Sequence, residues 1–420
     1  MDLSVVIPTY KEGKNISKLV FKLHDAIRDF SNDYEIIIVD GGSEDGTAEN
    51  AQSAGAKVFV QRNPGYGNAL KEGFGAARGD YIITMDGDLS HDPVVIRDLW
   101  KSRNKSDIVI ASRYIKNGSA DMPYFRKFLS LALNKFFTYF LSIPVKDISS
   151  GFRLYKASSI KSMNITGQNF DVLQEILVRA YSDGYSVSEI PFRYRPREHG
   201  QSKLRLIKFG MSYLKSFLRL WLLRNSVESV DYDSRAYYSR IPLQRFWQRK
   251  RHGIITGMLD KNDDIIDIGC GTSKIIQDLP DAVACDISMG RLRYLQQNNK
   301  LLVCGDVRAL PFKDNTFDTV IFSNVIEHVP RCGSILSEIN RILRAGGTLI
   351  VATPDYGKIT WRVVEHVYDI VKLRGGYKQE HISQYDLPSL NKILKESGFQ
   401  IIEREYICNS ELVVKAMKNV

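Results

Sequence analysis

Cysteine is scarce in this sequence, and its spacing excludes two kinds of protein. The 420 residues contain only five cysteines, and no two of them form a Cys-x-x-Cys pair. Neither a disulfide framework nor a structural zinc site is therefore expected, and we expect a reduced, intracellular setting. A secretory signal is also not expected, since the pattern of a strand follows within a few residues of Met1.

A long uncharged apolar run is absent as well. The most apolar stretch, 128–145, contains Asn134 and Lys135. A helix that spans a bilayer needs about 20 predominantly apolar residues, so we do not expect this stretch to cross one alone. A second stretch, 204–224, mixes Leu, Ile, Phe and Trp with Lys and Arg at helical spacing. That pattern is typical of a helix in a membrane interface, and equally of a helix packed on its own domain.

Acidic residues are few in one part of the chain. The formal net charge is +10, and residues 191–251 hold 15 Lys and Arg but only four Asp and Glu. Phosphate-bearing partners are expected there, while a solvated basic face is the alternative. A nucleic-acid partner is not expected, because no helix-turn-helix, zinc-finger or RNP-like pattern is present.

Short apolar runs alternate with helical patterns at the start of the chain. The runs expected to be buried strands are Leu3–Ile7, Glu35–Val39, Lys57–Val60, Tyr81–Met85 and Asp107–Ala111. The segments with helical periodicity between them are Ile16–Phe30, Thr47–Ala54, Gly67–Ala77 and Pro93–Arg103. This alternation predicts an α/β fold in which helices cover both faces of a mostly parallel, doubly wound sheet.

A second alternation of this kind follows residue 251. Its expected strands are Asp264–Ile268, Ala282–Cys285, Leu301–Cys304, Thr319–Phe322 and Thr348–Ala352. No internal repeat relates the two halves, so we expect a second, separate doubly wound fold. Residues 225–251 are polar, aromatic and basic, which predicts a connector between a domain of residues 1–224 and one of residues 252–420.

Polar motifs follow three expected strands of the first half, at the edge where open parallel sheets bind ligands. In the third motif, Asp86 and Asp88 flank Gly87 directly after an apolar strand. Two like charges this close repel each other unless a cation or hydrogen bonds offset the repulsion. A divalent ion, Mg²⁺ or Mn²⁺, that joins them to a diphosphate would do so and would neutralise the leaving group. Taken alone, an Asp-x-Asp turn is usually only a turn.

In combination and in this order, the motifs resemble the A-type fold of glycosyltransferase family 2. Four later segments are similar to those of its polyprenol-phosphate (dolichol-phosphate) mannosyltransferases: Ala111–Tyr114, Tyr124–Ser130, Asp147–Arg153 and Arg197–Leu204. The resemblance covers roughly residues 1–224. It implies inverting transfer of a hexose, mannose from GDP-mannose in these relatives, to a polyprenyl or dolichyl phosphate at a membrane surface.

The same resemblance implies a role for individual residues. Those expected to bind the nucleotide sugar are Pro8, Tyr10, Glu12, Asp40, Asp86, Gly87, Asp88, Arg197 and Lys203. The metal would be held by Asp88 and Ser90, and the acceptor phosphate by Arg113, Arg126 and Ser130. Catalysis would depend on Asp86, Asp88 and Arg113. A strong general base is not expected, because the acceptor phosphate is already ionised at neutral pH.

Two departures from the family pattern keep alternatives open. The family usually has Asp-Asp where this chain has Asp40-Gly41, and the missing carboxylate can contact the base. A UDP-sugar such as UDP-glucose, with a lipid or protein acceptor, is therefore the alternative donor. Ser90 stands where some members have Gln, so the affinity for metal can differ.

A turn with two glycines opens the second alternation. Residues 267–271, Asp-Ile-Gly-Cys-Gly, follow an apolar strand and precede a helix, and such glycines let the backbone approach a ligand. The third glycine of a dinucleotide fingerprint is absent. Asp286 and Asp306 each end one of the next two strands. This series resembles class I S-adenosylmethionine-dependent methyltransferases across about residues 232–420.

The second resemblance implies S-adenosyl-L-methionine as cofactor. The residues expected to bind it are Asp267, Gly269 and Gly271 at the methionine moiety, Asp286 at the ribose, Asp306 and Val307 at the adenine, and Ser323 near the sulfonium. If a hydroxyl is methylated, His328 is the nearest candidate for a catalytic base, while a residue without chemistry is equally expected there. His381, in a Glu-His-Ile-Ser stretch, is a weaker candidate.

The expected whole is a bifunctional enzyme that is cytoplasmic and peripheral on the cytoplasmic face of a membrane. The two sites would serve one pathway, and the methylated molecule would be a small molecule, a glycan or a lipid. The sequence does not indicate the oligomeric state. Two other classes stay open: a methyltransferase-like half that serves only for docking, and a membrane scaffold or nucleic-acid binder based on the basic stretch 191–251.

Overall fold

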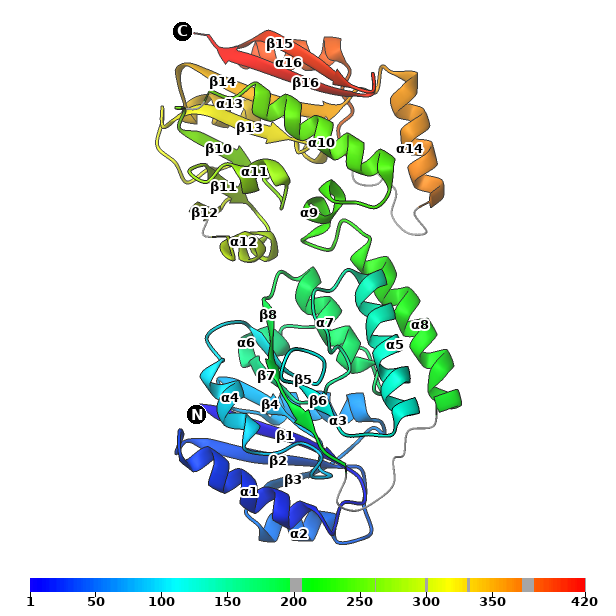
Figure 1. The fold of residues 1–420 in the computed structure, drawn as a ribbon. Helices are drawn as coiled ribbons and strands as arrows, with labels where there is room; N and C mark the ends of the chain where they lie inside the picture. The colour runs from blue at the N-terminus through cyan, green and yellow to red at the C-terminus, as the bar shows by residue number, and fades with distance from the viewer. Residues whose placement is uncertain (197–205, 261, 299–300, 331–332, 372–380, 420) are drawn as a thin grey trace. The chain divides into compact units, whose positions relative to one another are not determined.

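The computed structural model describes residues 1–420 except 197–205, 261, 299–300, 331–332, 372–380 and 420 (Figure 1). The chain divides into two compact units, Met1–Ser229 and Val230–Val420. Each unit contains a seven-stranded sheet with helices on both faces. The predicted fold class, α/β with two doubly wound sheets, is confirmed.

The sheet of the first unit has the strand order β3-β2-β1-β4-β7-β5-β8. Its strands are β1 (Leu3–Thr9), β2 (Tyr34–Asp40), β3 (Lys57–Val60), β4 (Tyr81–Thr84), β5 (Ile108–Ser112), β7 (Arg153–Lys156) and β8 (Val187–Pro191). Two short strands, β6 (Ser119–Ala120) and β9 (Arg193–Tyr194), pair separately. The helices are α1 (Ile16–Arg28), α2 (Thr47–Ser53), α3 (Tyr66–Ala76), α4 (Val95–Lys101), α5 (Tyr124–Leu141), α6 (Ala157–Lys161), α7 (Val172–Ser182) and α8 (Leu206–Arg224).

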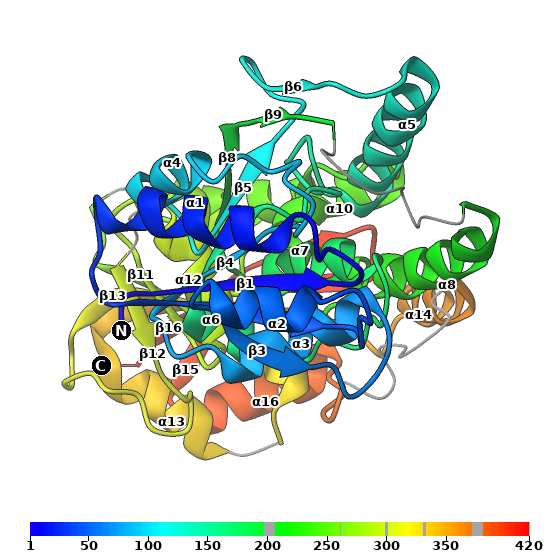
Figure 2. The same ribbon diagram turned by 90° about the horizontal axis from the view of Figure 1, so that it is seen from below.

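The central strand β1 shows why the sequence forms this layered structure. Its side chains alternate between the two faces of the sheet. Val5 and Ile7 pack in one core with α1 and α4, whereas Val6 packs in the other with α3. Figure 2 shows α1 and α4 on one side of β1 and α3 on the other. Because both faces are covered, the strand is apolar along almost its whole length.

One strand of this sheet departs from the predicted pattern. β7 lies between β4 and β5 and is antiparallel to both. Its four residues carry Arg153 at one end and Lys156 at the other, so they do not form the apolar run of a buried strand.

The sheet of the second unit has the order β12-β11-β10-β13-β14-β16-β15. Its strands are β10 (Ile265–Ile268), β11 (Val283–Asp286), β12 (Leu301–Cys304), β13 (Phe317–Ser323), β14 (Leu343–Pro354), β15 (Phe399–Ile407) and β16 (Glu411–Lys418). The helices are α9 (Tyr232–Tyr237), α10 (Pro242–Gly257), α11 (Lys274–Asp278), α12 (Met289–Gln296), the short 3₁₀ helix η1 (Ile326–His328), α13 (Gly333–Ile342), α14 (Ile359–Val371) and α16 (Leu387–Glu396). The last two strands form an antiparallel hairpin that joins the sheet beside β14.

Two separate cores hold this second sheet between its helices. On one face α13 and α16 bury Ile339 and Leu394, and on the other α10 and α11 bury Ile255 and Ile276. The stretch 225–251, predicted as a connector, contains α9 and most of α10, which belong to this unit. The partly buried Trp247 packs on the core, whereas Ile241, Leu243 and Phe246 are exposed, and the charged side chains make the stretch look like a linker.

Expectations about cysteines and membrane helices can be compared directly with the structure. The cysteines among the described residues, Cys270, Cys285, Cys304 and Cys408, are free. Within the described ranges no helix is both long enough and apolar enough to cross a bilayer. This agrees with the expectation that 128–145, most of which lies in α5, does not span a bilayer alone.

Candidate active sites

Three strand ends bring the predicted donor residues of the first unit to one edge of its sheet. β1 pairs in parallel with β2 on one side and with β4 on the other. Residues 10–12 follow β1, Asp40 ends β2, and residues 86–88 follow β4 closely. The chain adds strands in opposite directions from this point, which is where open α/β sheets form a ligand crevice.

The predicted metal residues Asp88 and Ser90 are in direct contact. Asp88 is only 3% exposed, and its Oδ1 accepts hydrogen bonds from the backbone N–H of Ser90 at 3.0 Å and from the Ser90 hydroxyl. Carboxylate and hydroxyl oxygens are the ligands that Mg²⁺ and Mn²⁺ prefer, so these two side chains fit a hard divalent ion. Gly87 allows the turn to lie close to β1, because a Cβ there would be 2.9 Å from Cγ2 of Thr9.

Asp86 is the more open of the two aspartates and lies beside a buried histidine. Its backbone N–H donates to Nδ1 of His91 at 3.0 Å, so the neutral ring carries its proton on Nε2, which lies 3.7 Å from Oδ2 of Asp86. Burial lowers the pKa of His91, although the negative charges of Asp86 and Asp88 act to raise it. The ring stacks on Phe152 with centroids 5.0 Å apart. His91 therefore fixes the backbone of Asp86 through Nδ1, a contact that the sequence analysis did not predict.

Asp40 is buried, and its carboxylate is hydrogen-bonded to residues that follow or end two neighbouring strands. It is 1% exposed, and its carboxylate accepts from the Thr9 hydroxyl (3.1 Å), the Ser43 backbone N–H (2.7 Å) and the Ser43 hydroxyl (2.6 Å). Ser43 in turn accepts from the backbone N–H of Lys11 at 2.7 Å. Asp40 thus fixes the loops that carry Tyr10 and Glu12, and its two oxygens already have donors.

The predicted acceptor residues are split between a buried pair and an exposed helix. Arg113 forms a two-pronged ion pair with Asp147, through Nε at 2.8 Å and Nη2 at 2.7 Å. Nη2 also donates to Ser149 at 2.7 Å. On α5, the Ser130 hydroxyl accepts from the Tyr114 hydroxyl at 2.7 Å.

Three basic residues remain to be placed. Arg126 is exposed on α5, and Arg197 and Lys203 lie outside the described residues. A fourth basic residue, Arg153, lies on β7, is fully buried and donates to the carbonyls of Leu173 and Ile148 at 2.8 and 2.7 Å.

In the second unit, the glycine turn after β10 forms a cradle of backbone. Gly269 and Gly271 both have left-handed backbone, with φ of 65° and 55°. The N–H of Gly271 donates to Oδ2 of Asp286 at 2.9 Å. Burial, together with the charge of Asp286, raises the pKa of Asp267 well above its ordinary value.

Helix α9 lies over this glycine turn, a relationship that the sequence analysis missed. A Cβ at Gly271 would lie 2.8 Å from Oδ2 of Asp233. The Thr272 hydroxyl donates to the Val230 carbonyl at 2.6 Å, and the Tyr294 hydroxyl donates to Ser234 at 3.2 Å. The polar composition of residues 230–237 indicates a linker, and only the fold shows that they cover the predicted cofactor loop.

The other predicted cofactor residues lie at or just beyond the ends of β12 and β13. Asp306 is paired with Arg308, whose hydrogen bonds lower the pKa of the Asp306 carboxyl to about 2. Val307 follows Asp306 and is partly exposed. Ser323 ends β13 and donates to the side chain of Asn324 at 3.1 Å.

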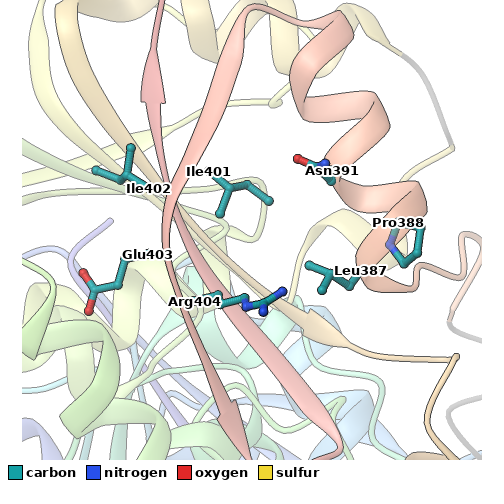
Figure 3. Close-up of a pocket in the computed structure, with 7 residues that line it drawn as sticks. All are labelled: Leu387, Pro388, Asn391, Ile401, Ile402, Glu403 and Arg404. Carbon is teal, nitrogen blue, oxygen red and sulfur yellow. The ribbon is translucent and has the colours of Figure 1, made fainter.

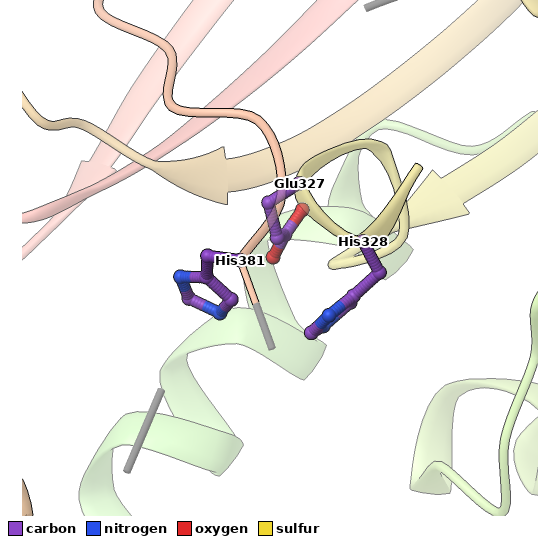
Figure 4. A group of neighbouring side chains, drawn as sticks. All are labelled: Glu327, His328 and His381. Carbon is purple, nitrogen blue, oxygen red and sulfur yellow. The ribbon is translucent and has the colours of Figure 1, made fainter. Parts of the chain in front are cut away.

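His328 belongs to a compact group with Glu327 and His381 (Figure 4). One ligand atom from each of the three side chains lies within 4.8 Å of the others. Burial raises the pKa of Glu327 to about 8. Burial, followed by the charge of His328, lowers the pKa of His381 to about 4.

A hollow of about 620 Å³ lies between α16 and β15 (Figure 3). Its lining residues are Leu387, Pro388, Asn391, Ile401, Ile402, Glu403 and Arg404. None of these is among the predicted site residues, and β15 is the edge strand of the sheet.

Comparison with known proteins identifies both units. Residues 4–163 match the model of glycosyl transferase family 2. A dolichol-phosphate mannosyltransferase of Pyrococcus furiosus is 34% identical over 242 residues, which are 55% of this chain and 66% of that protein. A polyprenol monophosphomannose synthase of Mycolicibacterium smegmatis is 31% identical over 217 residues, which are 48% of this chain and 80% of that protein. The chain belongs to glycosyltransferase family 2.

The family 2 region is followed by a second transferase domain. Residues 266–351 match the model of a methyltransferase domain. A third relative of the family 2 region is an undecaprenyl-phosphate 4-deoxy-4-formamido-L-arabinose transferase of Edwardsiella ictaluri, 32% identical over 214 residues, which are 49% of this chain and 64% of that protein. The chain thus spans slightly less than two thirds of the Pyrococcus and Edwardsiella proteins.

Proposed function

We propose that the first unit transfers a hexose, mannose from GDP-mannose, to a polyprenyl or dolichyl phosphate. The observation that carries this proposal is the pair Asp86 and Asp88 at the crevice edge, with the Ser90 hydroxyl bonded to Asp88. The names of the relatives support it, since two of them transfer or synthesise mannosyl lipids and the third acts on undecaprenyl phosphate.

In this proposal Asp88 and Ser90 hold a divalent ion, which supplies positive charge to the leaving diphosphate. Asp86, whose backbone N–H is bonded to Nδ1 of His91, binds the donor sugar. Arg113 presents its guanidinium to the acceptor phosphate from a fixed position, because Asp147 and Ser149 hold Nε and Nη2. The chain's own groups thus bind, orient and neutralise charge, and none of them needs to remove a proton.

The acceptor lipid would reach this site from a membrane surface. The first half of α5 exposes Tyr124, Phe125 and Phe128 at 93, 75 and 70%. Helix α8 packs one face on its own unit through the buried Leu220 and exposes Leu218 on another. Aromatic and basic side chains together on exposed helices suit a membrane interface, which we place at the cytoplasmic face.

Direct assay of transfer tests the proposal. The purified chain is incubated with Mn²⁺, labelled GDP-mannose or UDP-glucose, and a polyprenyl phosphate, and the lipid product is counted. Mannosyl lipid from GDP-mannose supports the proposal, and glucosyl lipid alone contradicts the choice of donor.

The UDP-sugar alternative is favoured by one observation. Both Asp40 oxygens are engaged by Thr9 and Ser43, and Gly41 carries no second carboxylate. A guanine base would therefore have to find its acceptor groups elsewhere. Calorimetry that compares the binding of GDP and UDP separates the two donors. In this alternative the second unit is a docking module without activity.

For the second unit we propose S-adenosyl-L-methionine-dependent methylation of a small molecule, glycan or lipid. The cofactor fits the cradle, because Gly269 and Gly271 leave room at the positions where a Cβ would meet Val325 and Asp233. Asp286 would hold the ribose, and Asp306 and Val307 the adenine. Calorimetry with S-adenosylhomocysteine tests this, and failure to bind would favour the docking module.

A further inference from the structure

The group Glu327, His328 and His381 lies beside the proposed methyl-donor loop. Glu327 and His328 are in η1, just after Val325, whose side chain a Cβ on Gly269 would meet at 2.5 Å. The Thr353 hydroxyl of β14 donates to Oε2 of Glu327 at 3.2 Å. The group therefore lies at the carboxyl ends of β13 and β14, the edge where such sheets bind ligands.

Glu327 carries a buried oxygen that lacks a hydrogen-bond donor. The side chain is 1% exposed, and Oε1 has no hydrogen-bond partner among the described residues. A buried carboxyl oxygen without a partner is costly, so this oxygen favours a ligand that pairs with it, and a cation is such a ligand. Figure 4 shows the carboxylate close to both imidazole rings.

His381 is held in the form that binds a metal ion. The Tyr356 hydroxyl donates its single proton to Oε1 of Glu365 at 3.0 Å. It can therefore only accept from His381, whose Nδ1 lies 2.6 Å away. The proton of the neutral ring is thus on Nδ1, and Nε2 carries the lone pair. Metal-binding histidines commonly have this arrangement, with the other ring nitrogen donating to a fixed partner.

We propose that Glu327, His328 and His381 form a binding site for a divalent transition-metal ion that holds the oxygen acceptor of methyl transfer. Two imidazoles and one carboxylate suit zinc, cobalt, nickel, manganese or iron better than magnesium, and three protein ligands leave coordination positions for an acceptor. Ligands at about 2.1 Å from one ion lie roughly 3.4 Å apart, so the three ligand atoms, now within 4.8 Å of one another, need to close by at most about 1.4 Å on binding. This role rests on the proposed methyltransferase function.

The chemistry balances without a further reactant. A hydroxyl bound to the metal ion loses its proton to water, because the cation lowers the pKa of a bound oxygen acid. Its oxygen then forms a bond to the methyl carbon as the carbon–sulfur bond breaks. The electron pair of that bond stays on sulfur, which leaves as the neutral thioether of S-adenosylhomocysteine.

Cobalt binding to the full chain tests the site without any methyl acceptor. We would use the chelator-treated Asp88→Asn chain, so that the proposed ion site of the first unit does not contribute, and follow the visible absorbance of added Co²⁺. We expect one bound ion, and a loss of affinity of at least about tenfold in both His328→Gln and His381→Gln. His366→Gln, an exposed histidine of α14, is the matched control and should bind like the parent.

A second variant separates binding from folding. Tyr356→Phe keeps the ring but removes the hydroxyl that orients His381, and should weaken Co²⁺ binding by about 10- to 100-fold while circular dichroism stays unchanged. Equal Co²⁺ affinity in the parent, His328→Gln and His381→Gln chains would overturn the site. Calorimetry with S-adenosylhomocysteine on the same samples tells the two proposals apart: if it binds while Co²⁺ does not, the metal site is wrong and the methyltransferase proposal stands.

Discussion

The guanidinium of Arg113 lies against the carboxylate of Asp147, and the same carboxylate also accepts from the Arg113 backbone N–H at 3.0 Å. Asp147 is fully buried and the Arg113 side chain is 12% exposed. The pair joins the end of β5 to the segment before β7, so the proposed phosphate-binding arginine is part of the core structure. Function and stability are therefore coupled at this position.

Breaking this pair should destabilise the first unit. Asp147→Asn removes the charge but leaves Arg113 buried, and loss of one partner of a buried pair costs about 3–5 kcal/mol. Urea unfolding of the full chain would measure the loss as a lower midpoint of one transition. Asp98→Asn, at an exposed position of α4, is the control and should change the midpoint little.

The same pair should make stability depend on acid pH. Burial acts to raise the pKa of Asp147, but the hydrogen bonds and charge of Arg113 outweigh it and hold the pKa below its ordinary value of 3.8. A carboxyl whose pKa is lower when folded contributes stability above its unfolded pKa, and loses it as the pH falls through the folded value. The urea midpoint of unfolding is measured at a series of pH values from 6 downward. At pH values under about 4 it should therefore decrease more steeply in the parent than in Asp147→Asn. Parallel curves for the two chains would contradict this account.

Gly271 should be required for cofactor binding because it has no side chain, and not only because its backbone is left-handed. In Gly271→Ala, the new methyl group would lie 2.8 Å from Oδ2 of Asp233, and the residue would also keep φ near 55°. Gly346→Ala imposes a similar left-handed strain, at φ of 72°, but meets nothing within 4 Å. We expect both variants to lose roughly 1–2 kcal/mol of stability. Only Gly271→Ala should weaken S-adenosylhomocysteine binding, by at least about tenfold in calorimetry.

The exposed aromatic side chains of α5 should promote binding to membranes. Replacing Phe125 and Phe128 together by Glu removes two apolar groups and adds two negative charges, which anionic lipid repels. Flotation with vesicles that contain phosphatidylglycerol should recover much less of this variant than of the parent. Phe21→Glu, on α1, is the control because Phe21 is 57% exposed. Equal recovery of all three chains would exclude α5 from the membrane contact.

The sequence predicted the strands that carry the motifs because each is an apolar run followed at once by polar residues. β1 with residues 10–12, β4 with residues 86–88 and β10 with residues 267–271 all follow this rule. β7 does not, since antiparallel insertion between two strands leaves no local signal in four residues that include two basic ones.

Relationships between distant segments could not be predicted from periodicity. The covering of Gly271 by Asp233 joins a stretch that looks like a linker to a glycine turn. The approach of His381 to Glu327 joins two positions that lie far apart in the sequence. His91 follows the Asp86–Asp88 motif closely in the sequence, but its contact with the Asp86 backbone requires the turn geometry.

The most direct test of the account is sugar transfer by a chain in which Asp86 and Asp88 are both replaced by Asn. These changes keep the size of the side chains and remove the two negative charges that the donor and its ion require. Transfer from GDP-mannose to polyprenyl phosphate, measured with Mn²⁺ beside the Asp98→Asn control, should fall at least about 1,000-fold if positioning and charge neutralisation depend on this pair. Transfer at the rate of the control would contradict the central claim.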